Sequence, residues 1–321
     1  MTGPVASAVR ARWTGRQFHN QPEESHTHGF LAALWEEVAR ETGGELAITV
    51  HARNGGVAGS DPSALAMLVA GELEFMTLMG GLIGQVVPVA EIQGLPFAFE
   101  SHRQVHHVMQ GPLGDHVRDA MAAKGIHGFR HGVLENGFRH IVSIDRPVRT
   151  AADLAGYRMR IPAGRVFEDL FRSLGAEPVV VNIDALYAAL RDREVDGQEN
   201  PLVITEVNRL YEVCRYVSLT GHMWSGFNLI GNLGFWRRLP ERVQEIVNRA
   251  VAKHVARQRA YTDGFNTELK TKLETERNLA FNAADVESFR RALSADFYRR
   301  WKREFGARAW SLLEAAVGRP M

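Results

Sequence analysis

Cysteine is almost absent from this chain, which contains one cysteine in 321 residues. Cys214 has no second cysteine with which to form an intramolecular disulfide, and this neither supports nor excludes an exported protein. Long apolar runs are also missing: none approaches the ~20 residues of a membrane helix, so we expect a protein that is not membrane-embedded. Residues 1–13 are expected to be a loose leader, and they lack the apolar stretch of a signal peptide.

Neither sign of charge is in excess. Lys and Arg together number 38, and Asp and Glu together number 37. The basic surface that nucleic acid requires is therefore missing, and we expect no nucleic-acid partner. Hydrophobic residues make up 45% of the chain, which is enough for a large core and excludes a disordered protein. The length allows one large domain or two of ordinary size.

Recognisable catalytic and metal-binding motifs are missing as well. The chain has no nucleophile elbow, no Gly-rich phosphate loop and no H-E-x-x-H motif. His102 and His106 have the spacing of a metal pair on a helix, but no third ligand follows at a recognisable distance. Solvated helix faces are the simpler interpretation for these histidines and for His26 and His28. These motifs therefore give no indication of catalysis, and we expect no metal and no cofactor.

The most informative stretch covers residues 154–202. Its opening, residues 157–161, alternates apolar and basic residues and stops at Pro162. This pattern predicts a short strand with Arg158 and Arg160 on one face. The planar guanidinium of an arginine at a strand end can bind a carboxylate through two parallel hydrogen bonds.

In the rest of this stretch, the spacing of the apolar residues alternates between that of a helix and that of a strand. Residues 166–174 have helical spacing, 179–181 read as a buried parallel strand, and 184–190 read as a second short helix. Alternating strands and helices indicate an α/β fold with its function at the strand ends. As an alternative to carboxylate binding, Arg158 and Arg160 are both solvated or paired with acids such as Asp153.

Two motifs together resemble a known family. Gly156-Tyr-Arg-Met-Arg160-Ile-Pro162 and Asp196-Gly-Gln-Glu-Asn-Pro201 resemble motifs of the DctP-like substrate-binding proteins of tripartite ATP-independent periplasmic (TRAP) transporters. The resemblance extends from residue 20 to about residue 240 and continues more loosely beyond. It implies a monomeric, periplasmic two-domain α/β clamp that closes on an organic acid and delivers it to the TRAP membrane permease subunits, without catalysis. The export signal would then be missing from this sequence.

We expect nine ligand-binding residues: seven at positions that the resemblance indicates, and Trp224 and Phe227 as apolar wall in place of the aromatic residue of many relatives. Arg160 would bind the carboxylate, Arg139 and Asn200 would add hydrogen bonds, and six more residues would line the site: Asn20, Asp61, Met79, Ile183, Trp224 and Phe227. Most of these residues have a structural alternative in the sequence itself. Arg139 could brace the crossover between domains, Asn20 could be a turn residue, and Asp61 and Asn200 could cap helices. Trp224 and Phe227 could belong to the core.

Met79 and Ile183 depart from the pattern of some relatives. Sialic-acid-binding relatives have a carboxylate where this chain has Met79, and many relatives have an aromatic residue where it has Ile183. Both departures weigh against a sialic-acid-like ligand. A sugar acid, a short dicarboxylate and an aromatic or branched monocarboxylate remain open.

The C-terminal third begins with a helical pattern that runs from Pro240 towards Leu273. In the family such a helix spans two domains, which we expect here to comprise residues 14–136 plus 225–265 and residues 137–224 plus 266–321. The ligand would bind in the cleft between them, and closure would be a hinge motion. An enzyme acting on an organic acid and a ligand-binding sensor are the alternatives. Product formation or genes for permease subunits nearby would distinguish them.

Overall fold

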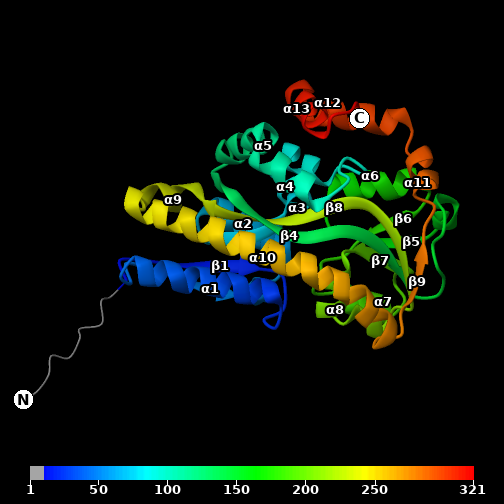
Figure 1. Cartoon of the computed structure of the whole chain (residues 1–321), viewed down its shortest axis with the longest axis horizontal. Helices are drawn as coiled ribbons and strands as arrows, with labels where there is room; N and C mark the ends of the chain where they lie inside the picture. Colours follow the sequence, from blue (N-terminus) through cyan, green and yellow to red (C-terminus); the bar gives the residue numbers. More distant parts are fainter. Residues whose placement is uncertain (1–10) are drawn as a thin grey trace, which may run out of the picture.

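Two long strands run antiparallel through the middle of the protein. The computed structural model describes residues 11–321, and the two strands are β4 (Ile126–Ser143) and β8 (Tyr216–Asn232). They pair from Ile126 opposite Asn232 to Ser143 opposite Tyr216, with shifts of register between. In Figure 1 they lie at the centre of the molecule and extend across much of its width.

Shorter strands extend this pair into one nine-stranded sheet of order β2-β1-β3-β8-β4-β7-β5-β6, in which β9 also pairs with β8. The shorter strands are β1 (Trp13–His19), β2 (Leu46–His51), β3 (Phe75–Met79), β5 (Arg158–Ile161), β6 (Glu177–Val180), β7 (Gly197–Asn200) and β9 (Ala280–Ala283). Strands β1–β3 are parallel to one another and join the later part of β8. Strands β5–β7 are also parallel, and β7 joins the last part of β4. Each parallel group therefore lies at a different end of the long pair.

Helices cover the sheet. Their bounds are α1 (His26–Glu41), η1 (Arg53–Gly56), α2 (Ser60–Ala70), α3 (Gly80–Ile83), η2 (Pro88–Gly94), α4 (His102–Gln110), α5 (Pro112–Ala122), η3 (Ala151–Leu154), α6 (Arg165–Ser173), α7 (Leu186–Arg191), α8 (Leu202–Val207), η4 (Leu210–Glu212), α9 (Leu233–Arg238), α10 (Glu241–Thr275), α11 (Val286–Ala292), α12 (Ala295–Phe305) and α13 (Ala307–Val317). Figure 1 shows α4, α5 and α6 along one side of the β4–β8 pair and α1, α8 and α10 along the other. The α/β prediction is confirmed.

The predicted long helix is α10, which has 35 residues. It packs on β4, on α1, which follows β1 in the chain, and on α8, which follows β7. The side-chain amide of Gln258 accepts a hydrogen bond from the backbone N–H of Glu135 and donates one to the Glu135 carbonyl. This side chain therefore satisfies the backbone N–H and carbonyl of Glu135 next to the bulge that Asn136 forms between Glu135 and Gly137.

One predicted element differs from the structure. The strand near residues 179–181 is not buried: β6 is at the edge of the sheet, and Val180 is 53% exposed. The segment after residue 283 forms two helices, α11 and α12, which are separated at Leu293. β4 continues through Asn136-Gly137, although this dipeptide is typical of a turn. Residues 1–10 of the expected leader lie outside the described part of the chain.

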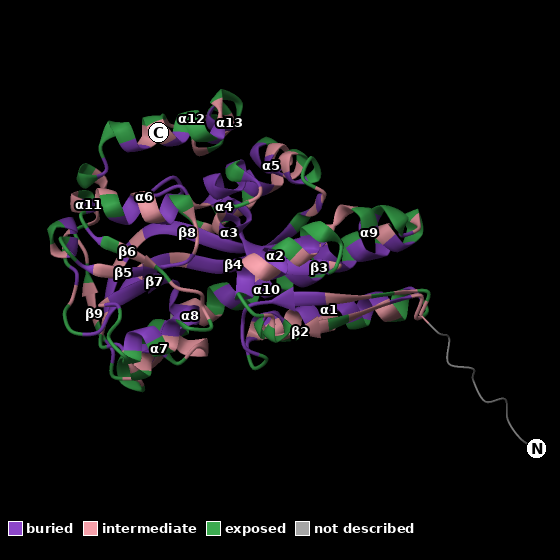
Figure 2. Cartoon of the chain, turned by 180° about the vertical axis from the view of Figure 1, so that it is seen from behind, coloured by how far each residue is buried: buried purple, intermediate pink, exposed green. Residues whose placement is uncertain are grey.

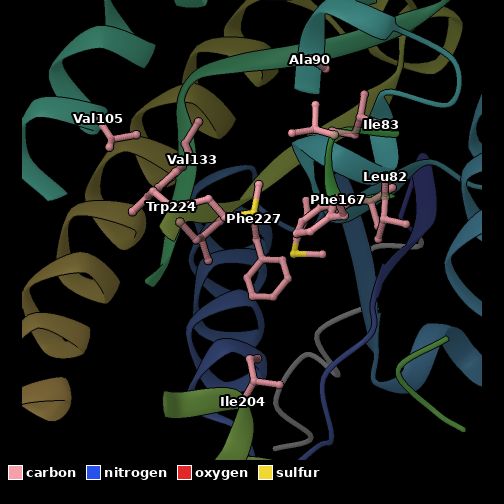
Figure 3. Packing of buried hydrophobic residues seen from close by; sticks show 14 of the residues in the cluster. Leu82, Ile83, Ala90, Val105, Val133, Phe167, Ile204, Trp224 and Phe227 are labelled. Atoms are coloured by element: carbon pink, nitrogen blue, oxygen red, sulfur yellow. The ribbon is translucent and has the colours of Figure 1, made fainter. Parts of the chain in front are cut away.

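Buried side chains fill the space between the sheet and its helices. Figure 2 shows β4 and β8 buried over most of their length, while the outer faces of the surrounding helices are exposed. Figure 3 shows part of this core, including Trp224, Phe227 and Phe167. Among residues 11–321, no helix combines the length and apolarity required to cross a bilayer.

Candidate functional site

A small cavity lies at the carboxyl ends of β1, β3, β5 and β7, where α/β proteins usually bind ligands. Its volume in this structure is only about 20 Å³. Its lining residues are Asn20, Gln21, Asp61, Met79, Asn136, Arg139, Arg160, Pro162, Ile183, Asn200, Ile204 and Phe227. All the residues expected from the sequence except Trp224 are therefore together. They come in equal measure from the two ranges that the sequence assigned to separate domains.

Arg160 is a buried cation of this cavity, and its terminal nitrogens have no protein hydrogen-bond acceptor among the described residues. Its side chain is 2% exposed, and its Nε donates to the carbonyl oxygen of Val181 at 2.8 Å. Within residues 11–321 no acceptor contacts its two terminal nitrogens. Burial lowers the pKa of Arg160 to about 10, an effect that Glu199 and Asp61 oppose, so the guanidinium is charged at neutral pH.

Its neighbour Arg158 lies on the same strand and is bound elsewhere. Its Nε and Nη2 donate to the carboxylate of Asp196, at 3.4 Å and 2.5 Å. The acid proposed from the sequence, Asp153, instead accepts from the backbone N–H of Thr150 in a capping box. The two arginines of the motif therefore have different surroundings, one in solvent and one in the cavity.

Arg139 also lines the cavity, but protein acceptors surround it. Its Nε and Nη2 donate to the carboxylate of Glu199, at 2.5 Å and 2.7 Å. Nη2 also donates to Asn200 Oδ1 at 2.9 Å, and Nη1 donates to Ser225 Oγ at 3.2 Å and to the Met79 sulfur at 3.4 Å. All three of its nitrogens are thus engaged, and the bracing role is the one that this geometry supports. Only the weak bond to sulfur could readily be exchanged for a ligand oxygen.

Glu199 is the buried counter-ion of Arg139. Its side chain is fully buried. Burial by itself would raise the pKa of Glu199, but the charge and hydrogen bonds of Arg139 outweigh burial and keep the pKa below its usual value. His222 adds a contact at 3.3 Å from its Nε2 to the same carboxylate. The pair positions the end of β7, on which Asn200 lies.

Asn200 does not cap α8, contrary to the alternative drawn from the sequence. Pro201 occupies the N-cap position and makes no side-chain bond there. The amide of Asn200 instead accepts from Arg139 and donates to Gln198 Oε1. Its orientation is therefore determined within the cavity wall.

Asp61 is not a helix cap either. Gly59 is the N-cap of α2, and Asp61 is 4% exposed within the first turn. Its two carboxylate oxygens accept from Asn20 Nδ2 at 2.9 Å and from Asn54 Nδ2 at 2.7 Å. Burial raises the pKa of Asp61, while both amides and the charge of Arg160 oppose this rise. Asn20 thus belongs to a buried network rather than to an isolated turn.

The apolar part of the wall consists of Met79, Ile183, Ile204 and Phe227. Trp224, the remaining expected residue, is not among the lining residues. It lies three positions from Phe227 on β8, and residues an odd number apart on a strand point to opposite faces. Its indole Nε1 donates to Glu135 Oε1 at 2.9 Å, away from the cavity.

Sequence reasoning missed four lining residues: Gln21, Asn136, Pro162 and Ile204. Gln21 and Pro162 adjoin residues that it had named, so the ends of β1 and β5 could have pointed to them. Asn136 is at the bulge of β4, which leaves no trace in the sequence pattern. Ile204 faces the cavity from α8 and looks like an ordinary core residue in the sequence.

A larger cavity lies between α4 and α10, where it is open to solvent. Its wall includes His102 and His106, which were expected to be solvated. Both contact the same oxygen of buried Glu135, His102 Nδ1 at 3.0 Å and His106 Nε2 at 2.7 Å. His28, likewise, contacts His19 at 3.0 Å. Among the described residues, no group of three or more His, Cys, Asp and Glu side chains has a metal-binding arrangement.

Comparison with known proteins identifies the family to which the chain belongs. The sequence model of the bacterial extracellular solute-binding proteins, family 7 (DctP), matches residues 18–304. The chain belongs to this family. Members of the family are receptors that bind small solutes rather than enzymes, and they act outside the cytoplasm. The family expectation drawn from the two motifs is thus confirmed.

Relatives and solved structures place the chain within the TRAP receptors. It is 35% identical over 193 residues to the uncharacterized protein y4mM of Sinorhizobium fredii, a match that covers 60% of this chain and only 35% of that relative's length. A TRAP periplasmic solute-binding protein from a Sulfitobacter species, bound to β-D-galacturonate, has 26% identity and a TM-score of 0.88 over 95% of this chain and 99% of that one. A Polaromonas TRAP protein bound to D-erythronate has 27% identity and a TM-score of 0.88 over 96% of this chain and 99% of that one.

Proposed function

We propose that this protein binds a small organic acid through its carboxylate and delivers it to the membrane permease subunits of a TRAP transporter. The observation that supports this most is Arg160, whose guanidinium is buried and charged and has two terminal nitrogens available in a small cavity. A desolvated arginine that faces a small cavity is suited to a bidentate carboxylate. The relatives bound to galacturonate and erythronate are similar in fold over nearly the whole chain.

The remaining wall would orient the acid once Arg160 has bound it. Asn200 would add a hydrogen bond from its NH₂ group, which lines the cavity and has a second N–H besides the one directed to Gln198. Arg139 would act mainly as a positioning residue, because Glu199 already binds it. Asn20 and Asp61 would contact the ligand from the β1–β3 side, and Met79, Ile183 and Phe227 would exclude water from it.

Closure would bring these two sides together. Residues 14–136 plus 225–265 and residues 137–224 plus 266–321 would move as two domains about β4, β8 and α10, the elements that connect them. A ligand that contacts both sides stabilises the closed form by its differential affinity for that form. The receptor would act as a monomer in the periplasm and would present its closed form to the permease.

A thermal-shift screen over organic acids tests this proposal. A ligand present at 100 times its Kd stabilises the protein by about 2.7 kcal/mol, which raises the melting temperature by several degrees. We expect at least one carboxylic acid to give such a shift and its methyl ester or amide to give none. Equal shifts with the acid and with its uncharged derivative would contradict recognition of the carboxylate.

A further inference from the structure

The polar groups of the ligand cavity are unevenly distributed between its two sides. From β5, Arg160 offers terminal N–H groups and no acceptor. Around Asn20, Gln21, Asp61 and Asn136 the unengaged atoms are oxygens, as the hydrogen bonds of these residues show. The ligand must therefore be complementary to donors at one place and to acceptors at another.

The first unengaged oxygen follows from Asp61. Because each oxygen of this carboxylate accepts from an amide, Asn20 must present its NH₂ to Asp61 and its carbonyl oxygen to Gln21. Gln21 accordingly donates its own Nε2 to Asn20 Oδ1 at 2.7 Å. This leaves Gln21 Oε1 buried, with no partner among the residues that the structure describes. A carboxylate can accept about four hydrogen bonds, so Asp61 also retains capacity.

The second unengaged oxygen follows from Ser225 by the same reasoning. The hydroxyl of Ser225 donates to the Gly137 carbonyl, and its oxygen accepts from Arg139 Nη1. Asn136 must therefore direct its NH₂ to that oxygen, which it does at 3.0 Å. Its own Oδ1 remains without a partner in the described part of the chain, although the side chain is only 1% exposed.

An additional donor lies on the side of Arg160. Since Arg139 donates to Asn200 Oδ1, the Asn200 NH₂ is directed to Gln198 Oε1. Gln198 Nε2 is consequently buried and unpartnered within residues 11–321. Gln198 is the registered neighbour of Arg160 across β5 and β7, although it is not itself a lining residue. The cavity wall thus presents the donors of Arg160 on the β5 side and acceptors around β1 and the bulge of β4.

We propose that the ligand is a monocarboxylate with several hydroxyl groups, and that Gln21, Asp61 and Asn136 accept hydrogen bonds from those hydroxyls. The proposal rests on the proposed function, in which Arg160 binds the carboxylate. A second carboxylate would face Asp61 and bare amide oxygens, so dicarboxylates are disfavoured by repulsion. An apolar acid would leave the same buried oxygens unpaired, and sites built to bind hydroxyls reject such analogues strongly.

Matched acids of equal chain length test the proposal with the wild-type protein. We would measure the Kd of D-erythronate, succinate and butyrate, and of the six-carbon set D-galactonate, adipate and hexanoate, by titration calorimetry. In at least one set the polyhydroxy acid should bind roughly tenfold or more tightly than both other acids. If succinate, adipate or an unsubstituted acid binds equally well or better, this inference is wrong and the carboxylate assignment stands. If none of these acids binds, the carboxylate assignment is contradicted and this inference fails with it.

Substitution of Asp61 tests whether this residue causes the preference for the polyhydroxy acid. D61N removes the charge and one acceptor, so it should reduce the preference for the polyhydroxy acid over the dicarboxylate by roughly tenfold. Asp184 provides the control: it is exposed and influences Asp61 and Arg160 electrostatically, but it does not line the cavity. D184N should leave the preference unchanged. An unaltered preference in a folded D61N protein, or an equal loss in D184N, would contradict the role of Asp61. If D61N does not fold, Q21L replaces it with the same expectation.

Discussion

Arg139 and Arg160 line the same cavity, yet the guanidinium of Arg139 is fully hydrogen-bonded within the protein and that of Arg160 is not. Every nitrogen of Arg139 has a protein acceptor, including both carboxylate oxygens of Glu199. Arg160 has one such bond, from Nε to the Val181 carbonyl, and its terminal nitrogens contact no acceptor among residues 11–321. One arginine therefore organises the wall, whereas the other is available to an anion.

Removing the negative charge of Glu199 should destabilise the protein strongly. E199Q leaves the buried guanidinium of Arg139 without its counter-ion, and breaking a buried pair in this way costs about 3–5 kcal/mol. Denaturant unfolding followed by circular dichroism measures this cost. The control is D145N, because Asp145 pairs with Arg193 on the surface. D145N should leave the free energy of unfolding essentially unchanged, and equal effects of the two substitutions would contradict the argument.

His102 should make the stability depend on pH. Burial by itself would lower the pKa of His102, but hydrogen bonding to Glu135 and the nearby negative charge outweigh burial and raise it above 6.5. A raised folded-state pKa adds stability that is complete below the unfolded-state pKa and is lost as the pH rises through the folded-state pKa. H102Q should therefore differ most from wild type in free energy of unfolding below pH 6.5, and the difference should shrink in alkaline solution.

The measurement is a series of denaturant titrations between acid and alkaline pH. In an E135Q background the pH-dependent part of the H102Q effect should be largely absent, since the partner charge is gone. A difference between H102Q and wild type that grows with increasing pH would have the wrong sign and would refute the assignment.

Two glycines should respond oppositely to the same substitution. Gly137 has φ +132°, and an added Cβ would lie 3.0 Å from the Cβ of Pro201. G137A should therefore destabilise the protein by about 1–3 kcal/mol. Gly264 is exposed within α10 and has no atom within 4 Å of the added Cβ, so G264A should stabilise the helix by roughly 0.5–1 kcal/mol. Thermal melts compare the two variants, and a stabilising G137A would show that the bulge does not require glycine.

Local patterns predicted much of the fold because they record burial and chain direction. The alternation around Arg160 and the proline after it correspond to β5 and its end, and the periodic apolar residues after Pro240 correspond to α10. Pattern alone could not place Val180 on an edge strand, because an apolar run looks the same whether or not a neighbour covers it. The strand order that leaves β6 at the edge is a tertiary property.

The candidate site, too, could be predicted from the sequence only in part. Asp61 has the sequence position of a helix cap, since it directly precedes Pro62. Its actual partner Asn54 reaches it because the backbone of Arg53, Asn54 and Ser60 is left-handed, with φ near +50°. Such a conformation is uncommon for these residues and is not indicated by composition. Trp224, by contrast, could have been excluded from the sequence, because its spacing from Phe227 places the two on opposite faces of a strand.

The availability of Arg160 is tested most directly by titration calorimetry of R160K with the acid that gives the largest thermal shift. Lysine cannot form the two parallel bonds, and losing a desolvated charged contact costs about 2–5 kcal/mol, or roughly 30-fold to several thousand-fold in affinity. R158K, on the same strand but paired with Asp196, is the control and should bind like wild type. Wild-type affinity in a folded R160K protein would contradict the account.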